Sequence, residues 1–411
     1  MADGELKWLF LDMNAFFASV EQQLDPQLRG RPVGVVPVMA DSSCCIAASY
    51  EAKRQGVKTG TRISDAKKLC PDIQLVAARP LEYVRVHDKI VEAVNSVIPV
   101  HKVHSIDEMA CRLTGSQCQE ARALELGRQA KQAIRDQVGD QLLSSVGIST
   151  NRFLAKVAGN LQKPDGLSLI RSQDLPEALY PLELRDLTGI GKGMAARLQQ
   201  HGIRSVAQLC ALSSAQLRDI WHGISGEWWW HALRGHDMPE PETTRRTVGH
   251  SHVLAPQYRT HEAARAVMVK LIHKAAMRLR KLGYYTGEMQ ITLRYPNKQD
   301  WQLKQPLEPC QDTQSLLKVF SGMWKQRLTR AAPMSVGVTL QKLVPEASMS
   351  LPLFPEDRRR QKLGVLMDEI NIKFGPQSVY LATMQDASEA APMRISFTKI
   401  PDIEVEGDRH H

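Results

Sequence analysis

Two short acidic segments, each at the end of a strand-like stretch, constrain most strongly how this chain can fold. The first is Asp12, which ends the apolar run Trp8–Leu11. An apolar run of this length is typical of a buried strand, and the pattern that begins at about Ala15 predicts a helix. We therefore expect a strand that exposes Asp12 at its tip and is followed directly by a helix.

The second acidic segment is the pair Asp107 and Glu108, which has strand-like sequence on both sides. The flanking side chains alternate as in a hairpin, with Val103 and Ser105 before the pair and Met109, Cys111 and Leu113 after it. Two acidic strand tips side by side would repel each other unless a cation neutralised them. Mg²⁺ prefers oxygen ligands, and two such ions can hold the attacking and leaving oxygens of a phosphoryl transfer. The alternative is that Asp12 caps a helix and that the acidic pair forms a solvated turn.

Length and composition limit the class of protein. The chain has 411 residues, of which 43% are hydrophobic, so we expect several domains that each bury a core. No apolar run is long enough to span a membrane, and the polar, acidic start is not a secretory signal. The seven cysteines are scattered without a CxxC pair, which indicates reduced thiols in the cytoplasm rather than a zinc site or disulfides. The net charge of +9 favours a polyanionic partner.

Five segments resemble the motifs of the bacterial Y-family, or translesion, DNA polymerases, and they occur in the family's order. They are Leu11–Glu21, Ala47–Val57, Ser105–Glu108, Gly147–Lys156 and Gln162–Gly166. The resemblance extends from about Trp8 to Pro345. One motif alone is weak, whereas five in order are a strong signal.

The sequence combines features of two branches of the family. Tyr50 resembles the polymerase IV branch, whereas Asn14, Ala15 and Lys53 resemble the catalytic subunit of polymerase V. Polymerase IV often has Arg at the position of Lys53. Lysine keeps the positive charge but loses the two-pronged geometry of the guanidinium.

The resemblance implies a multidomain fold of α/β and α+β type, arranged as a right-hand polymerase. The expected parts are a palm at 1–23 and 77–171, small fingers at 24–76, a helix-hairpin-helix thumb at 172–236, a linker at 237–247, an α+β little finger at 248–345 and a C-terminal extension at 346–411. The pattern from 248 to 345 also predicts strand, helix, strand, strand, helix, strand from the sequence itself. The first of these helices is rich in Arg and Lys, which could face DNA or simply be solvated.

Two further segments are expected to bind partners. Residues 188–203 resemble a helix-hairpin-helix, in which Gly189, Gly191, Lys192 and Gly193 would approach a DNA phosphate; a plain corner between two helices is the alternative. Residues 350–354 resemble the peptide by which bacterial polymerases bind the sliding clamp, with the anchors Leu351, Leu353 and Phe354. A buried strand-like edge is the alternative there.

The resemblance assigns the chemistry to named residues. Asp12, Asp107 and Glu108 would be catalytic and would hold two Mg²⁺ ions, with the carbonyl of Met13 as a further ligand and Mn²⁺ as a substitute metal. The residues expected to bind the incoming nucleotide are Phe16, Phe17, Tyr50, Lys53 and Lys163. Phe17 would be the steric gate that excludes a 2′-hydroxyl, and its neighbour Phe16 would belong to the core.

The expected function is DNA-templated DNA synthesis of low fidelity past damaged bases, with primer–template DNA, dNTPs, a sliding clamp and SOS accessory proteins as partners. No segment reads as a proofreading exonuclease. Two other functions compete: a catalytically silent homologue that acts as a clamp-bound scaffold, and a helix-hairpin-helix repair nuclease. The first needs no metal site, and the second leaves the nucleotide residues unexplained.

Overall fold

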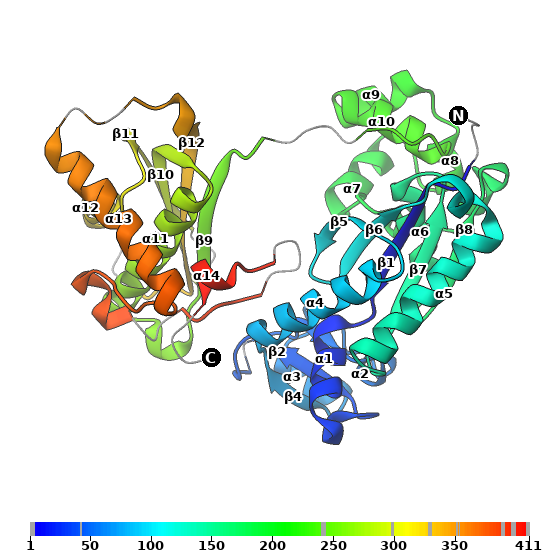
Figure 1. Ribbon diagram of the computed structural model, residues 1–411, viewed down its shortest axis with the longest axis horizontal. Coiled ribbons are helices and arrows are strands. Elements are labelled where there is room, and N and C mark those ends of the chain that lie inside the picture. Colours follow the sequence, from blue (N-terminus) through cyan, green and yellow to red (C-terminus); the bar gives the residue numbers. More distant parts are fainter. Residues whose placement is uncertain are drawn as a thin grey trace. The chain divides into compact units, whose positions relative to one another are not determined.

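The computed structural model describes residues 5–41, 43–239, 244–296, 300–327, 331–350, 352, 354–387, 391–395 and 400–407 (Figure 1). The chain divides into two compact units. The first is Met1–Pro241 with Ile395–Ile400, and the second is Glu242–Arg394 with Pro401–His411. The boundary between 241 and 242 falls inside the segment 237–247 that we expected to be a linker.

A five-stranded sheet forms the centre of the first unit. Its strand order is β5-β6-β1-β7-β8, with β1 antiparallel to both neighbours and β8 parallel to β7. The strands are β1 (Trp8–Met13), β5 (Val100–Ser105), β6 (Glu108–Arg112), β7 (Ser144–Ser149) and β8 (Leu167–Ile170). The hairpin predicted around Asp107 and Glu108 is therefore β5-β6, and it lies directly beside the predicted first strand.

Helices cover both faces of this sheet. They are α1 (Phe16–Leu24), α4 (Pro80–Asn95), α5 (Glu120–Gln137) and α6 (Arg152–Leu161). Gly127 of α5 faces Val146 and Ile148, whereas α6 lies against Gly147, so α5 and α6 occupy opposite faces. The approach of α6 requires glycine, because a Cβ at Gly147 would lie 2.0 Å from the carbonyl oxygen of Ala155.

Two local expectations for the sheet were wrong. Met109, Ala110 and Cys111 are all buried, so β6 lacks the predicted alternation of buried and exposed side chains. The reason is that helices cover both faces. In addition, β1 continues through Met13, and the side chain of Asp12 is only 14% exposed rather than open at a strand tip.

The segment between α1 and α4 forms a small separate layer. Its sheet has the order β3-β2-β4, built from β2 (Val33–Val36), β3 (Ala47–Ala48) and β4 (Gln74–Ala77). Two helices, α2 (Tyr50–Arg54) and α3 (Ile63–Leu69), complete it, after the 3-10 turn η1 (Pro26–Leu28). Its core is made of small residues such as Cys45, Ala48 and Ala52, which suits a layer of this size.

The region from 172 to 236 is helical. After three 3-10 turns, η3 (Ser172–Asp174), η4 (Glu177–Leu179) and η5 (Leu184–Asp186), it contains α7 (Lys192–Gln200), α8 (Val206–Cys210), α9 (Ser214–Trp221) and α10 (Ile224–Leu233). Trp229 of α10 is 5% exposed and packs into a core that also includes Phe153 of α6. This shared core fixes the helical region against the central sheet.

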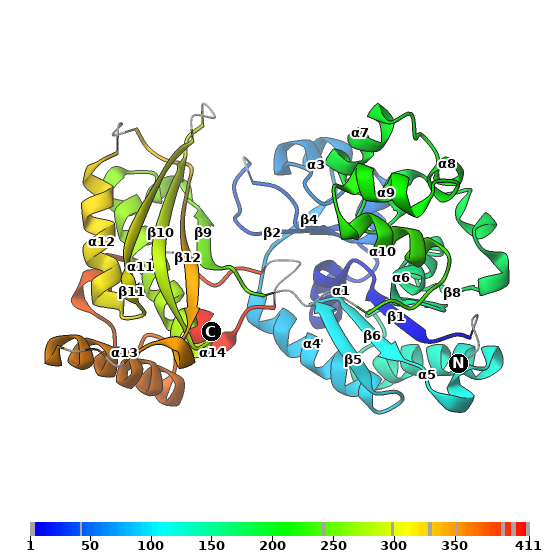
Figure 2. The ribbon, with the colours of Figure 1, turned by 90° about the horizontal axis from the view of Figure 1, so that it is seen from above.

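The second unit contains the predicted order of strands and helices. Its elements are β9 (Thr247–Val253), α11 (His261–Lys281), β10 (Tyr284–Arg294), β11 (Trp301–Cys310), α12 (Thr313–Lys325) and β12 (Ser335–Pro345), with the turn η6 (Pro256–Tyr258) before α11. The antiparallel sheet has the order β11-β10-β12-β9, and both helices pack on one of its faces (Figure 2). The predicted α+β sandwich is confirmed.

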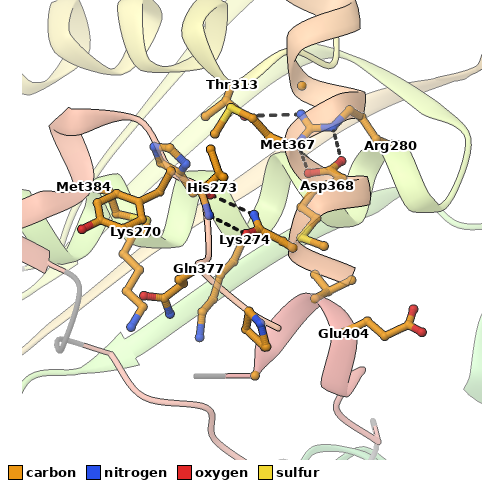
Figure 3. A pocket seen from close by; sticks show the side chains of 18 residues that line it. Lys270, His273, Lys274, Arg280, Thr313, Met367, Asp368, Gln377, Met384 and Glu404 are labelled. Atoms are coloured by element: carbon orange, nitrogen blue, oxygen red, sulfur yellow. Dashed lines mark hydrogen bonds and ion pairs between the residues drawn. The ribbon is translucent and has the colours of Figure 1, made fainter. Parts of the chain in front are cut away.

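The described part of the C-terminal extension is also folded. It contains η7 (Glu346–Ser348), the long helix α13 (Pro355–Phe374), η8 (Ala382–Ala387) and α14 (Ile403–Glu406). Arg280 of α11 forms a two-pronged ion pair with Asp368 of α13, at 2.6 and 2.8 Å (Figure 3). Lys281 of the same helix pairs with Asp402 at 2.7 Å. The basic side chains of α11 are therefore not simply solvated, since Lys270 is 1% exposed and Arg280 is bound to the extension. Across the parts of the chain that the structure describes, none of the helices combines the length and apolar character needed to cross a bilayer.

Candidate active site

The three carboxylates predicted to act together do lie at one edge of the central sheet. Asp12 on β1 is directly opposite Glu108 on β6, a register that puts the two Cβ atoms about 5 Å apart. Asp107 occupies the turn between β5 and β6, where its carbonyl accepts a hydrogen bond of 2.8 Å from the backbone N–H of Met13. The strand pairing thus positions all three, although they are distant in sequence.

Two lysines neutralise this acidic edge. Lys163 Nζ lies 2.6 Å from Asp12 Oδ1, and Lys156 Nζ lies 2.6 Å from Glu108 Oε2. Asp107 instead accepts a hydrogen bond of 2.5 Å from Ser105 Oγ. Lys163 comes from the loop between α6 and β8, and Lys156 comes from α6, so the close approach of α6 to the sheet supplies the charge balance.

Burial dominates the electrostatics of the carboxylates. It raises the pKa of Asp12 to about 6, against the opposing effect of Lys163, and the charges of Glu108 and Asp107 add to the rise. Burial also raises the pKa of Asp107, which the hydrogen bond from Ser105 partly offsets. Burial therefore makes the ionised form of these carboxylates unfavourable, and a bound cation would stabilise it.

The donor set fits a hard divalent cation in kind. Carboxylate oxygens from three residues and the nearby carbonyl of Met13 are the ligands that Mg²⁺ prefers. Within the described residues, however, no three His, Cys, Asp or Glu side chains converge closely enough to hold a metal ion. Asp12 and Glu108 instead form ion pairs with Lys163 and Lys156.

A cavity of about 210 Å³ opens beside Asp12 and Asp107. Its far wall is the layer of α2 and β3, which contributes the other predicted nucleotide residues, Tyr50 and Lys53. Lys53 Nζ lies 4.3 Å from the centre of the Tyr50 ring. Lys53 and Lys163 both line this cavity. Burial lowers the pKa of Lys53, and the positive charge of Lys163 lowers it further. An anionic ligand in the cavity could form ion pairs with both lysines.

Phe16 and Phe17 both line this cavity and are 3% and 2% exposed. Burial therefore does not distinguish the predicted gate residue from the predicted core residue. Their partners differ, because the Phe17 ring packs on Tyr83 at a centroid distance of 4.8 Å. Tyr83 donates a 2.7 Å hydrogen bond to Glu21, a fully buried carboxylate that also pairs with Arg79.

The predicted DNA-binding glycines lie in the helical region, apart from the carboxylates. Gly189 has a φ of +102°, which favours glycine, and Gly191 is the N-cap of α7. Lys192 and Gly193 form the first turn of that helix, and nothing lies within 4 Å of a Cβ built at Gly191 or Gly193. The backbone of this turn is therefore open to an approaching phosphate.

The predicted clamp-binding anchors are only partly described. Leu351 and Leu353 lie outside the described residues, whereas Phe354 is the N-cap of α13 and is 67% exposed. An exposed phenylalanine at a helix start contradicts the alternative of a buried edge for this residue.

The sequence alone did not assign roles to Lys156, Glu21 or Tyr83. Lys156 stands in a recognised motif, and its spacing of four residues from Arg152 places both on one face of α6, but only the fold brings Lys156 to Glu108. A buried glutamate gives no signal in a single sequence, because Glu21 follows an ordinary helical pattern.

Comparisons with known families agree with this geometry. The model of the impB/mucB/samB family matches residues 11–160, and the model of the impB/mucB/samB family C-terminal domain matches residues 245–353. The model of the IMS family HHH motif matches residues 172–203. Together these matches include both acidic segments, the helical hairpin and the sandwich of the second unit.

Relatives and solved structures are similar over most of their length. The chain is 32% identical to the DNA polymerase IV of Moorella thermoacetica, over 93% of this chain and 97% of that protein, and 28% identical to DNA polymerase IV 1 of Bacillus subtilis, over 96% and 97%. A Y-family DNA polymerase chimera, Dbh-Dpo4(243-245)-Dbh, superposes with a TM-score of 0.70 at 24% identity, over 82% of this chain and 99% of the chimera. DinB from Sulfolobus solfataricus gives 0.53 at 25% identity, over 82% and 98%. The two bacterial relatives are named DNA polymerase IV, so the polymerase V features noted above are not needed to place the chain.

Proposed function

Because the chain belongs to the impB/mucB/samB family, the Y family of translesion DNA polymerases, we propose that it extends a primer on damaged DNA. The activity is DNA-templated DNA synthesis of low fidelity, in which the primer 3′-hydroxyl attacks the α-phosphate of a dNTP and pyrophosphate leaves. The observation that carries the proposal is the pairing of Asp12 with Glu108 beside a cavity that two lysines and two phenylalanines line.

The domain assignment follows the family. Residues 1–23 and 77–171 act as the palm, 24–76 as the fingers, 172–236 as the thumb and 248–345 as the little finger, with a linker at 237–247 and an extension at 346–411. The compact layer around β2 and α2 is small, so it would make few contacts that check the shape of the nascent base pair, and synthesis would have low fidelity. No segment of the sequence resembles an exonuclease, so proofreading is not expected.

In the palm, Asp12, Asp107 and Glu108 would hold two Mg²⁺ ions, with the Met13 carbonyl as a further ligand. When bound, Mg²⁺ lowers the pKa of the attacking hydroxyl and neutralises charge on the transferring phosphate. Lys163 lies within reach of both Asp12 and the cavity, so its ammonium can turn from the carboxylate to a triphosphate oxygen. Lys156 keeps Glu108 at the edge of the sheet.

The fingers and palm share the binding of the incoming nucleotide. Tyr50 and Lys53 face the cavity from α2 and would contact the triphosphate, with Lys53 as a point charge rather than a two-pronged donor. Phe17 would pack beneath the sugar and exclude a 2′-hydroxyl, while Phe16 completes the floor. The ring of Tyr83 packs against Phe17 and holds it in place.

Other parts would hold the DNA and its clamp. The open turn at Gly189–Gly193 suits a backbone phosphate at the start of α7, and the exposed Phe354 suits the groove of a bacterial sliding clamp, with Leu351 and Leu353 as the other anchors. Accessory proteins of the SOS response are further candidate partners. Synthesis would have low processivity unless a clamp tethers the polymerase to the DNA.

Primer extension with Mg²⁺ and dNTPs tests the proposal. The wild-type chain should extend the primer, and Asp107→Ala should abolish extension while DNA binding persists, because phosphate contacts elsewhere supply the affinity. Binding without extension by the wild type would instead favour the scaffold, and cleavage of the DNA would favour the nuclease. Extension by Asp107→Ala at a near wild-type rate would remove the metal-site assignment.

A further inference from the structure

A short loop presents Lys163 to the active-site cavity, and its backbone is fixed from two sides. The loop, residues 162–166, connects α6 to β8. Its tight path requires glycine at the end, because a Cβ at Gly166 would lie 1.9 Å from the carbonyl oxygen of Gln162. The residues that hold this loop therefore decide where Lys163 lies.

The first fixing point is the side chain of Asn14, which lies between β1 and α1 and is 2% exposed. Its Oδ1 accepts a hydrogen bond of 2.7 Å from the backbone N–H of Asp165. Because a backbone N–H can only donate, the amide oxygen must face the loop, and Nδ2 donates to Ser145 Oγ at 3.1 Å. Asn14 also lines the cavity, but both polar atoms of its amide have partners within the protein, so we expect it to act on the loop.

Ser145 of β7 extends this anchor to both ends of the loop. Its side chain is fully buried, and its Oγ lies 3.2 Å from the carbonyl oxygen of Gln162 and 3.3 Å from the backbone nitrogen of Gly166. A hydroxyl donates once and accepts twice, so it can donate to Gln162 while it accepts from Gly166 and from Asn14 Nδ2. The two side chains thus satisfy backbone groups on either side of the loop's lysine.

The outer side of the loop is held by charged residues of α5. Lys131 has a side chain that is only 12% exposed, and it pairs with Asp165 Oδ1 at 3.1 Å. Its ammonium also donates to the carbonyl oxygens of Asp165 and Gly166, and Arg135, one turn later, pairs with the same carboxylate. Asp165 has a φ of +61°, in the left-handed region that is unfavourable for most residues with a side chain, and these contacts offset that cost. The loop backbone is thus fixed on both sides, and the Lys163 side chain is its adjustable part.

We propose that Asn14 is a positioning residue for the incoming nucleotide, because its amide fixes the loop so that Lys163 Nζ can reach the triphosphate. The inference rests on the proposed function, which puts a dNTP in the cavity beside Asp12. Lys163 Nζ lies 2.6 Å from Asp12 Oδ1, at the wall of this cavity. Loss of the amide would leave the Asp165 N–H without its acceptor, and the loop would shift to recover one. A shift of the backbone two residues away would move the lysine away from a bound phosphate.

Binding of a dNTP to the full chain tests this inference without chemistry. The complex contains Mg²⁺ and a primer–template whose primer ends in a dideoxynucleotide, and a fluorescent base in the template reports the dissociation constant of the next correct dNTP. Asn14→Ala should weaken dNTP binding about tenfold and leave DNA binding unchanged. In a Lys163→Ala background the same substitution should weaken dNTP binding less than about twofold, because the lysine through which Asn14 acts is gone.

Two further variants separate positioning from a loss of folding. Asn14→Asp keeps an oxygen for the Asp165 N–H and should bind dNTP within about threefold of the wild type. Ser145→Ala removes a single oxygen atom and should show a smaller form of the Asn14→Ala defect. The matched control is Asn160→Ala, because Asn160 is exposed near the end of α6, close to the loop, and this variant should bind like the wild type. An Asn14→Asp variant as weak as Asn14→Ala would contradict the role of the amide oxygen.

Hydrogen–deuterium exchange of the free protein gives a readout that needs no substrate. The peptide that contains residues 162–166 should exchange faster in Asn14→Ala than in the wild type, whereas Asn160→Ala should leave it unchanged. Unchanged exchange of this peptide in Asn14→Ala, or a dNTP penalty of the same size with and without Lys163, would overturn the inference. A wild-type chain that binds dNTP with this coupling intact but does not extend an ordinary primer would refute the proposed function and leave the role of Asn14 standing.

Discussion

Asp12→Asn should make the metal-free protein more stable at neutral pH, although Asp12 is a proposed catalytic residue. The Asp12 side chain is only 14% exposed, and burial raises its pKa to about 6, compared with 3.8 for an ordinary aspartate. The folded protein therefore binds a proton more tightly than the unfolded chain does. Stability must then fall as pH rises from about 4 to about 6, because ionisation of this buried group opposes folding.

The size of the effect follows from the difference in pKa. A difference of about two units corresponds to ~3 kcal/mol in the free energy of unfolding at pH 7.5. Asparagine has a similar shape and carries no charge, so Asp12→Asn should recover most of that amount. Lys163 loses its partner in the variant, but its side chain is 29% exposed and can turn to water. The gain should shrink to ~1 kcal/mol at pH 4.5, where most of the wild-type Asp12 is already protonated.

Differential scanning calorimetry in EDTA measures this gain. The transition of the unit that contains Asp12 should rise by roughly 5–10 °C at pH 7.5 and by much less at pH 4.5. Asp140→Asn is the matched control, because Asp140 is exposed and the same substitution there should change little. A variant no more stable than the wild type at pH 7.5, or equally stabilised at both pH values, would refute the assignment of a buried charge cost to Asp12.

Three further variants, one with its own control, test separate parts of the molecule. Phe17→Ala should raise the ratio of rNTP to dNTP incorporation by removing the ring beneath the sugar, and an unchanged ratio in a folded variant would make Phe17 an ordinary core residue. Replacing Leu353 and Phe354 by Ala should remove stimulation by a loaded clamp without changing synthesis on a short primer. Each buried apolar side chain contributes about 1.5–3 kcal/mol, so losing both should weaken the peptide contact at least tenfold. Surviving stimulation would place the tether elsewhere. Asp368→Ala should lower the free energy of unfolding of the second unit by about 3 kcal/mol, because it leaves a buried guanidinium without its carboxylate. Chemical denaturation measures this loss. In that assay Asp402→Ala, at a more exposed ion pair, should lower the free energy of unfolding by under about 1 kcal/mol. Equal losses for the two variants would contradict the role of burial.

The elements that the sequence predicted are those with strong local patterns. The apolar run Trp8–Leu11 and the strand signals at β10 and β12 mark strands without help from the rest of the chain, and the place of Asp12 follows from where the first of these strands ends. The balance of charge at the active site could not be predicted in this way. Lys156 and Lys163 reach Glu108 and Asp12 only because Gly147 lets α6 lie against the sheet, a contact between segments that no local pattern encodes.

The predictions that failed also depended on contacts between segments that are distant in the sequence. Ala110 is buried although its strand was expected to have one solvated face, because coverage of the second face depends on α6. The helix α13 was not predicted, since its core-facing positions include Gly364 and Asp368, which are not apolar. Its position is fixed instead by an ion pair to Arg280, about ninety residues earlier in the chain.

The docking of α13 has a mechanical consequence for the proposed clamp-binding segment. The segment follows η7, which ends at Ser348, and Phe354 begins a helix that is fastened to α11, so folded elements lie on both sides of the segment. A six-residue segment between two attachments can reach only about 20 Å, far less than a free tail of fifty residues. A polymerase held in this way would have little freedom to swing on its clamp, and exchange with another polymerase would require release of the segment rather than reorientation of a long tether.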